Sequence, residues 1–261
     1  MKSAKIISII NQKGGVGKTT TAVNYGIGLA RKGKKVLLVD ADSQGSLTVS
    51  LGEHDLTALD ITLASLMYGI VMNRPIDPHL AILHHREGVD FIPSNYELSG
   101  VSTALTSLSN REFILKTILD SLREEYDYIL IDCLPSLGLL AINALVAADS
   151  VIIPCQPAYL PTKGLNILLR TIAKIRRALN PELQIDGILL TCADVHTKNA
   201  KEIMQSMRDS TNVRIFDTVI PRSVKVAECS IMGKSIYTHN RTGKVTEAYE
   251  QLIEEVLSYG I

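Results

Sequence analysis

The residues best suited to chemistry lie near the start of the chain, in the run Lys13-Gly14-Gly15-Val16-Gly17-Lys18-Thr19-Thr20. An apolar run, 6–10, precedes them, and a stretch with helical spacing, 20–31, follows. A strand, a glycine-rich turn and a helix start form a cradle in which backbone N–H groups and the positive end of the helix dipole face a phosphate. In such a cradle Lys18 reaches the β- and γ-phosphates, and the Thr19 hydroxyl ligates Mg²⁺. The run therefore predicts a site for a nucleoside triphosphate with Mg²⁺.

The run departs from the common P-loop pattern G-x-x-x-x-G-K-[ST]. Gln12 stands where the pattern has its first glycine, and a second lysine, Lys13, follows it. Packing does not explain Lys13, because Lys18 already serves the same phosphate site. The Lys13 ammonium can act on its own nucleotide or on one bound across a dimer interface. A surface turn that binds nothing is the alternative, and the strand and helix expected on either side argue against it.

Three carboxylates follow apolar runs farther along the chain. Asp132 ends the run 128–131, and we expect it to hold Mg²⁺, although an aspartate at a strand end can also cap a turn or helix. Asp40 and Asp42 follow the run 36–39. Side chains two apart on extended backbone point to the same side. The pair therefore fits a division of labour at a metal–phosphate centre, and the alternative is that one of them caps the following turn.

Four sequence blocks together resemble the ParA/MinD superfamily of deviant Walker A ATPases. The first is the run 13–20, and the second is Val36-Leu-Leu-Val-Asp-Ala-Asp-Ser-Gln-Gly45. The others are Ile129-Leu-Ile-Asp-Cys-Leu-Pro-Ser-Leu-Gly138 and Ile220-Pro-Arg-Ser-Val-Lys225. Within the superfamily the chain is most similar to the ParA/Soj branch, which partitions plasmids, chromosomes and related elements. The blocks span residues 5 to about 235, which is nearly the whole chain.

The resemblance assigns further roles. It implies that Asp42 orients the attacking water, that Asp40 supports the Mg²⁺ shell, and that Lys13 reaches the partner's ATP in a homodimer. Slow, dimer-dependent hydrolysis of ATP to ADP and phosphate follows from these roles. Pro221 and Arg222, together with 191–194, resemble the adenine-side loops, and a turn proline after a strand is the alternative for Pro221.

The resemblance also implies two partners. The ATP-bound dimers of this branch bind double-stranded DNA without sequence preference, through basic residues near the C-terminal half. Lys225 falls on one such position, and His196 stands where the other usually has arginine. Because histidine is largely neutral at pH 7, this departure weakens the expected contact. A ParB-like centromere-binding protein is expected to stimulate hydrolysis and release the dimer from DNA.

Other members of the superfamily provide alternative functions. A MinD-like ATPase that cycles on membranes needs a basic amphipathic C-terminal helix. The tail 247–261 carries several glutamates, so we expect an ordinary packing helix and no membrane partner. An iron–sulfur ATPase would need paired cysteines, a tyrosine autokinase would need a tyrosine cluster in the tail, and an amide-forming enzyme would need a second substrate pocket. The sequence shows none of these features.

Strand-like and helix-like segments alternate along the chain. Short, continuous apolar runs are typical of strands buried on both faces of a parallel sheet. They lie at 6–10, 36–39, 89–93, 128–131, 151–153, 188–191 and 218–220. Helical patterns lie at 18–32, 111–124, 138–147, 163–179, 198–208 and 244–258. We therefore expect a single domain, 1–261, of the α/β class: a doubly wound, mostly parallel sheet flanked by helices, with its ligand at the carboxyl ends of the strands.

The composition sets further limits. Lys plus Arg and Asp plus Glu number 27 each, so any DNA binding must come from a local basic patch. The four cysteines are far apart and without a C-x-x-C pair, which predicts free thiols in a reducing cytoplasm. We expect a cytoplasmic protein that associates with the nucleoid in its ATP state. The irregular stretch 48–78 is expected to form a short helical excursion over the nucleotide site.

Overall fold

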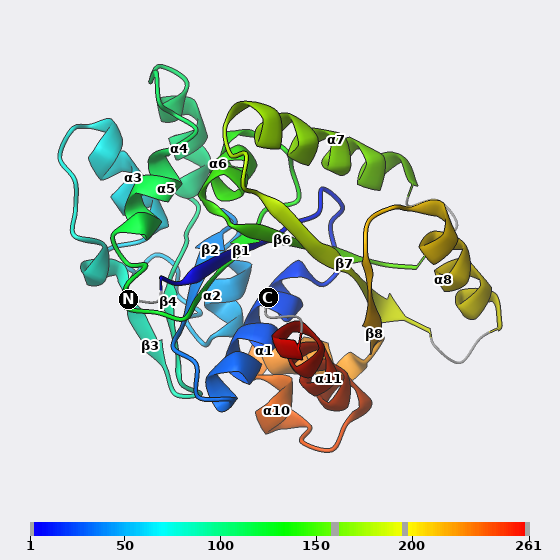
Figure 1. Ribbon diagram of the computed structural model, residues 1–261. Helices are drawn as coiled ribbons and strands as arrows, with labels where there is room; N and C mark the ends of the chain where they lie inside the picture. The colour runs from blue at the N-terminus through cyan, green and yellow to red at the C-terminus, as the bar shows by residue number, and fades with distance from the viewer. Residues whose placement is uncertain (1–2, 158–161, 195–197, 259–261) are drawn as a thin grey trace.

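The chain builds one mixed sheet that carries helices on both faces (Figure 1). This computed structural model describes residues 3–157, 162–194 and 198–258. In these residues the spatial order of the strands is β3-β4-β2-β5-β1-β6-β7-β8, and only the β3–β4 pair is antiparallel. The strands are β1 Lys5–Ile9, β2 Val36–Ala41, β3 Leu83–His85, β4 Val89–Ile92, β5 Tyr128–Cys133, β6 Ser150–Cys155, β7 Gln184–Ala193 and β8 Ile215–Pro221. The predicted doubly wound, mostly parallel sheet is confirmed.

Two helical layers cover the sheet, and the central strands supply side chains to both. On β1, Ile7 and Ile9 pack toward the layer of α1 and α11, whereas Ile6 packs toward the opposite layer. This two-sided burial is the reason that the strands read as continuous apolar runs. The helices are α1 Lys18–Arg31, α2 Ser46–Ser50, α3 Leu63–Val71, the 3₁₀ turn η1 Pro78–Ala81, α4 Leu98–Leu105, α5 Ile114–Asp120, α6 Leu139–Ala147, α7 Thr162–Ala178, α8 Lys198–Ser210, α9 Val224–Met232, α10 Ile236–His239 and α11 Lys244–Ser258.

Most differences from the expected elements lie in the short segments. The helix expected over 111–124 shrinks to α5, and the edge strand β3 and the helices α2, α4, α9 and α10 were not expected. The stretch 48–78 is not one excursion over the nucleotide site. It contributes α2 at that site, but α3 packs against α4 and α5, with Leu63 and Leu66 in the core. The apolar side chains of α3 explain its position, because a helix lying over an open site would expose them to water and lose the stabilisation that their burial provides.

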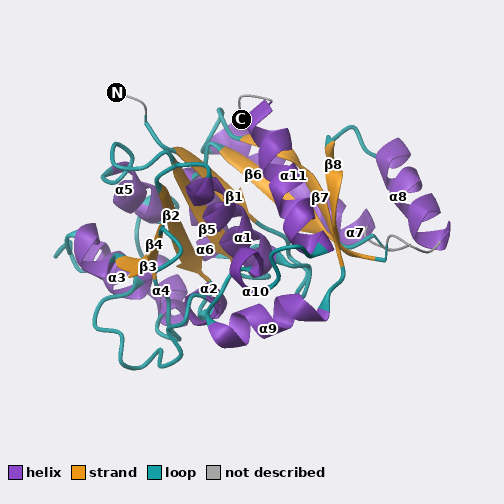
Figure 2. Ribbon diagram, turned by 90° about the horizontal axis from the view of Figure 1, so that it is seen from below, coloured by secondary structure: helices purple, strands orange, loops and turns teal. Residues whose placement is uncertain are grey.

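The carboxyl ends of the central strands meet at one edge of the sheet. The segments 11–19, 40–45, 132–138 and 191–194 all lie at such ends, either directly after a strand or across its last residues. Figure 2 shows α2 and α9 close together below this edge, and α2 also contacts α1. Among the described residues, no helix combines the length and the apolar character that crossing a membrane requires.

Candidate nucleotide site

A cavity of about 610 Å³ opens at this edge. The phosphate cradle forms one wall, and the loop after β2 and the helix α2 form another. Pro135 after β5, Cys192 near the end of β7 and Ser230 in α9 close the rest. The lining residues are Gly14, Gly15, Gly17, Lys18, Thr19, Thr20, Asp42, Gln44, Ser46, Val49, Ser50, Pro135, Cys192 and Ser230. The structure therefore brings together the predicted P-loop and Asp42, although 150 residues of chain separate Asp42 from Cys192.

The backbone of the cradle depends on two glycines in the left-handed region. Gly15 has φ 71°, and Gly17, which caps α1, has φ 82°. Side chains other than glycine rarely adopt this conformation. No side chain caps the start of α1, so its first N–H groups remain available for an anion. This is the geometry that the glycine-rich run predicts.

Three side chains hold the cradle in place, and none of them was expected in this role. The Asn11 side chain accepts the Lys13 N–H at 3.0 Å and donates to the Pro154 carbonyl at 2.8 Å. Gln156 donates to the Gly15 carbonyl at 2.8 Å, and the buried Thr191 hydroxyl donates to the Val16 carbonyl at 2.7 Å. The short spacing of Asn11 and Lys13 fits a turn in which an asparagine side chain binds backbone nearby. Nothing in the local sequence marks the other two.

The two lysines of the run have different environments. Lys18 is buried, and its Nζ donates to the Lys13 carbonyl at 3.3 Å. Burial lowers the pKa of Lys18, and the carboxylate of Asp132 acts in the opposite direction. Lys13 is exposed. An ammonium group at the surface beside the cavity can act outside its own chain, whereas the Lys18 ammonium cannot.

Thr19 and Asp132 meet below the cradle. The Thr19 hydroxyl donates to Asp132 Oδ2 at 2.6 Å, and the buried Oδ1 has no hydrogen-bond partner. Burial raises the pKa of Asp132 well above its ordinary range, the nearby Asp40 adds to this, and Thr19 and Lys18 oppose it. A buried carboxylate oxygen without a partner is costly, and a cation would satisfy it. A hydroxyl and a carboxylate are oxygen ligands of the kind that Mg²⁺ takes, so these residues fit that ion.

Asp40 and Asp42 take different positions. Asp40 is fully buried and is not part of the cavity lining. Its Oδ2 accepts the N–H and hydroxyl of Thr48, at 2.9 and 2.7 Å, and its Oδ1 accepts the Asp42 N–H at 3.2 Å. Burial raises the pKa of Asp40 to about 6, against these hydrogen bonds. Asp42 is half-buried and lines the cavity. Asp40 therefore anchors the loop that presents Asp42, and its metal role stays a prediction.

Pro221, Arg222 and Lys225, which were expected at the adenine and DNA contacts, are outside the cavity lining. Pro221 ends β8 beside Ala193, and the Arg222 N–H donates to the Ala193 carbonyl at 3.0 Å. Lys225 is exposed but forms an ion pair with Glu228 at 2.9 Å. His196 is outside the described residues. Cys192, on β7 and within the expected segment 191–194, lines the cavity together with Ser230 on α9, which was not expected as a site residue.

The doubly wound sheet, the glycine cradle and the Thr19–Asp132 pair define a P-loop nucleotide-binding protein. A family model described as "AAA domain" matches residues 4–185. The chain is 41% identical over 256 residues to the sporulation initiation inhibitor protein Soj of Bacillus subtilis, covering 98% of this chain and 99% of that protein. It is 40% identical to the chromosome partitioning protein ParA of Myxococcus xanthus, over 97% of this chain and 88% of that protein. The chain therefore belongs to the ParA/Soj family of partition ATPases.

Solved structures agree with this assignment. The cobyrinic acid a,c-diamide synthase of Mycobacterium smegmatis with bound ADP and magnesium has a TM-score of 0.86 and 33% identity, covering 98% of this chain and 95% of that one. A putative plasmid partition protein of Borrelia burgdorferi bound to AMPPNP has a TM-score of 0.80 and 28% identity, covering 99% and 100%. The fold is thus shared by proteins of different function, so the fold alone does not determine the particular function of this chain.

Proposed function

We propose that the protein is a partition ATPase that binds ATP and Mg²⁺ and dimerises around the nucleotide. The dimer binds nonspecific double-stranded DNA, associates with the nucleoid, and leaves DNA when a ParB-like partner stimulates hydrolysis. The names of the relatives support the partition role. The observation that carries the ATPase chemistry is the Thr19–Asp132 pair with its free buried oxygen beside Lys18.

Each residue of the cradle has a distinct task. The N–H groups at the start of α1 and the Lys18 ammonium bind and orient the phosphates. Thr19 and Asp132 hold Mg²⁺, which neutralises phosphate charge when it is bound. Asp42 is at the cavity wall, and it accepts a hydrogen bond from the attacking water and orients it. The nucleotide contacts extend from Lys13 through Thr20, with Pro221 and Arg222 on the side of the base.

Lys13 acts on the nucleotide of the other protomer. Its exposed ammonium, beside a cradle already neutralised by Lys18, is suited to stabilise charge that develops in the partner's transition state. Turnover per protomer should therefore rise with protein concentration through the dimer constant. Lys13→Gln should abolish this rise while it preserves ATP binding. Flat turnover from well below to well above that constant would contradict the role in trans.

The C-terminal helix gives no support to a membrane-cycling function. The apolar face of α11 is already packed against the core, through Val245, Tyr249, Leu252, Ile253 and Val256. A helix that binds a bilayer surface needs an apolar face that is free to enter the lipid. The nucleotide-dependent partner is therefore better assigned to DNA than to a membrane.

The Asp42→Ala variant tests the cycle. It should bind ATP, hydrolyse it slowly, and persist as a dimer on random-sequence DNA in ATP–Mg²⁺ but not in ADP. Asp60→Ala, which removes an exposed carboxylate from the loop after α2, is the matched control and should behave as the wild type. Normal hydrolysis by Asp42→Ala would remove the catalytic assignment. A dimeric variant that is not retained on DNA at low salt would remove the DNA step.

A further inference from the structure

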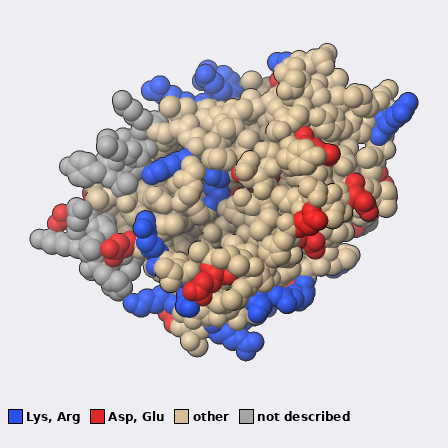
Figure 3. All heavy atoms as spheres, turned by 180° about the vertical axis from the view of Figure 1, so that it is seen from behind, with Lys and Arg blue, Asp and Glu red and all other residues tan. Residues whose placement is uncertain are grey.

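The helix α7 concentrates positive charge on a protein whose net charge is zero. Its sequence, Thr162–Ala178, contains five Lys or Arg residues and no Asp or Glu, whereas the whole chain is neutral. Arg170, Lys174 and Arg177 are exposed and follow one another at helical spacing, so they form one row, called here the α7 row. Figure 3 views the molecule from behind, so α7, at the upper right of Figure 1, comes to the upper left. Blue Lys and Arg groups lie along this edge, with no red group among them.

The α7 row has no partner within the part of the chain that the structure describes, unlike several other basic side chains. Lys5, Lys32, Lys116, Arg123, Arg208 and Lys225 all form ion pairs. None of the three residues of the α7 row forms an ion pair or a side-chain hydrogen bond, although each is on a well-formed helix. Their charge is therefore fully available to an external anion, whereas the charge of Lys225 is partly cancelled by Glu228.

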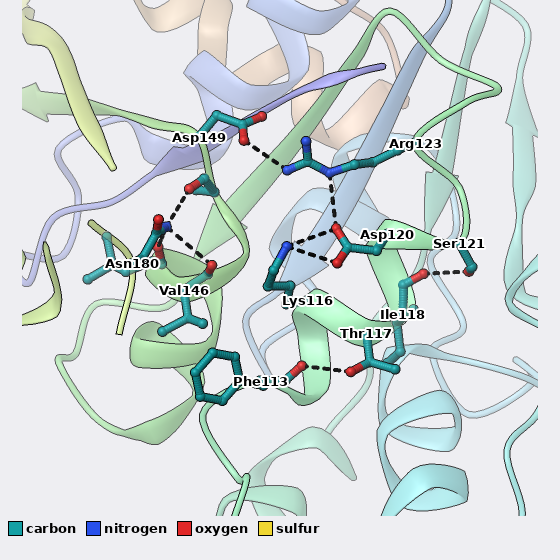
Figure 4. Close-up of polar contacts among 12 residues, drawn as sticks. Phe113, Lys116, Thr117, Ile118, Asp120, Ser121, Arg123, Val146, Asp149 and Asn180 are labelled. Carbon is teal, nitrogen blue, oxygen red and sulfur yellow. Dashed lines mark hydrogen bonds and ion pairs between the residues drawn. The ribbon is translucent and has the colours of Figure 1, made fainter. Parts of the chain in front are cut away.

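The helix that carries the row is fixed to the protein along its other face and at its end. Leu168, Ile172 and Ile175 are buried in the core below α7. Just after the helix, the Asn180 side chain donates to three carbonyls at the end of α6 (Figure 4), those of Leu145, Val146 and Ala148, at 3.0, 3.2 and 2.7 Å. Figure 4 also shows Arg123 between Asp120 and Asp149 in the same region. The α7 row is thus a preformed array rather than a loose tail.

The dimensions and the polarity of this array favour a nucleic-acid backbone over a bilayer. Seven residues of helix rise about 10 Å, which is the axial span of about three phosphates on one DNA strand. A membrane-bound helix needs a free apolar face, but the apolar face of α7 is buried, and Ile167, 51% exposed, is its one large exposed hydrophobic residue in the described part of the chain. A row of arginine and lysine beside a single exposed apolar side chain matches phosphate contacts that carry no sequence information.

We infer that the α7 row is a DNA-binding surface, which contacts phosphates of nonspecific duplex DNA and supplies affinity that Lys225 cannot supply alone. This inference rests on the proposed DNA binding of the ATP-bound protein and names a surface for it. If each of the three side chains neutralises one phosphate, the row contributes about 2.7 to the slope of log K against log salt per protomer. Between 50 and 200 mM salt this part of the affinity falls about 40-fold.

The test compares three proteins with a non-hydrolysable ATP analogue and Mg²⁺ on a random-sequence duplex across that salt range. They are the wild type, the triple variant Arg170→Gln/Lys174→Gln/Arg177→Gln, and the control Lys32→Gln/Lys35→Gln/Arg74→Gln, which removes the same charge from exposed positions elsewhere. The α7 variant should bind DNA at least tenfold more weakly at low salt, with a slope smaller by about 2.7 for each row that contacts the duplex, and retain the wild-type urea midpoint and basal ATPase rate. The control should bind as the wild type does.

Four outcomes would overturn the inference in distinguishable ways. If the wild type and the α7 variant have equal DNA affinity and equal salt dependence, the α7 row does not bind DNA, and the proposed function is unaffected. Equal weakening in the control would show that only net charge matters. Failure of the wild type itself to bind DNA would remove the DNA step of the proposed function. A second arm uses phosphatidylglycerol vesicles as competitor: binding to vesicles in preference to DNA, lost in the α7 variant, would assign the row to a membrane surface.

Discussion

Replacement of Thr48 by valine is expected to destabilise the loop that presents Asp42. Thr48 is fully buried in α2, the short helix that follows the loop carrying Asp42. Its hydroxyl donates to Asp40 Oδ2 at 2.7 Å and accepts the Ser94 N–H at 3.0 Å. Valine has nearly the same shape but removes both hydrogen bonds. The change therefore isolates the polar function of the side chain.

The magnitude follows from the two lost contacts. A hydrogen bond to a charged group contributes about 1.5–3 kcal/mol, and a buried N–H left without a partner costs about 1–3 kcal/mol. Thr48→Val should thus lower the free energy of unfolding by about 3–5 kcal/mol. Thr48→Ser, the matched control, keeps the hydroxyl and removes one buried methyl group, at a cost of about 1 kcal/mol.

Urea unfolding at pH 7, followed by circular dichroism, measures both changes, and single-turnover ATP hydrolysis reports on Asp42. Thr48→Val should be about 2–4 kcal/mol less stable than Thr48→Ser and should hydrolyse ATP more slowly at saturating nucleotide. Equal stability of the two variants would refute the view that the hydroxyl holds Asp40 and the loop together. A stable but inactive Thr48→Val would place its effect on Asp42 alone.

Three further predictions concern other contacts. Burial raises the pKa of Glu255, but the N–H groups of Asp217 and Thr218 and the Arg214 side chain outweigh it, so the folded pKa is below the ordinary 4.5. The contribution of Glu255 to the free energy of unfolding is complete above pH 4.5 and is lost as the pH falls through the folded pKa. Glu255→Gln should therefore lower that free energy by about 1–3 kcal/mol at pH 7 and by progressively less in acid. Urea titrations at several pH values measure this change. Thr191→Val, which removes the hydrogen bond to the P-loop, should weaken ADP binding in calorimetry more than Thr191→Ser does, and equal affinities would contradict a role for that hydroxyl. At Gly28 an added Cβ would be 2.0 Å from Ile253 Cδ1, so Gly28→Ala should lower the melting temperature through a loss of about 1–3 kcal/mol.

The order of strands and helices was largely predictable because it rests on local patterns. The expected helix 244–258 matches α11, and the expected strand 36–39 lies within β2. The helices that were missed, such as α2 and α10, have four or five residues, too few for a helical period to show. The antiparallel β3 was missed for a related reason: three partly exposed residues carry no apolar run, and their pairing with β4 identifies them as a strand.

The sequence by itself determined the phosphate cradle. The left-handed Gly15 and Gly17, the buried Lys18 and the Thr19 hydroxyl are adjacent in the chain, so local backbone conformation is enough to form the cradle once strand and helix flank it. The family resemblance follows from the same local blocks. Asp132 was also within reach, because a carboxylate at the end of a buried strand must lie at the ligand edge of a parallel sheet.

Only the tertiary structure decided which distant residues support that cradle and which charges remain free. Gln156 and Gly15 are 141 positions apart, and Thr191 and Val16 are 175 apart, so their hydrogen bonds depend on the order of strands in the sheet. The same holds for Asp40, whose carboxylate is bound by backbone and side-chain groups of α2 and is absent from the cavity wall. The sequence does not indicate whether a lysine forms an ion pair in the folded protein. Packing pairs Lys225 with Glu228 and leaves the α7 row without a partner in the described chain, because an ion pair requires two side chains that the fold brings within about 4 Å.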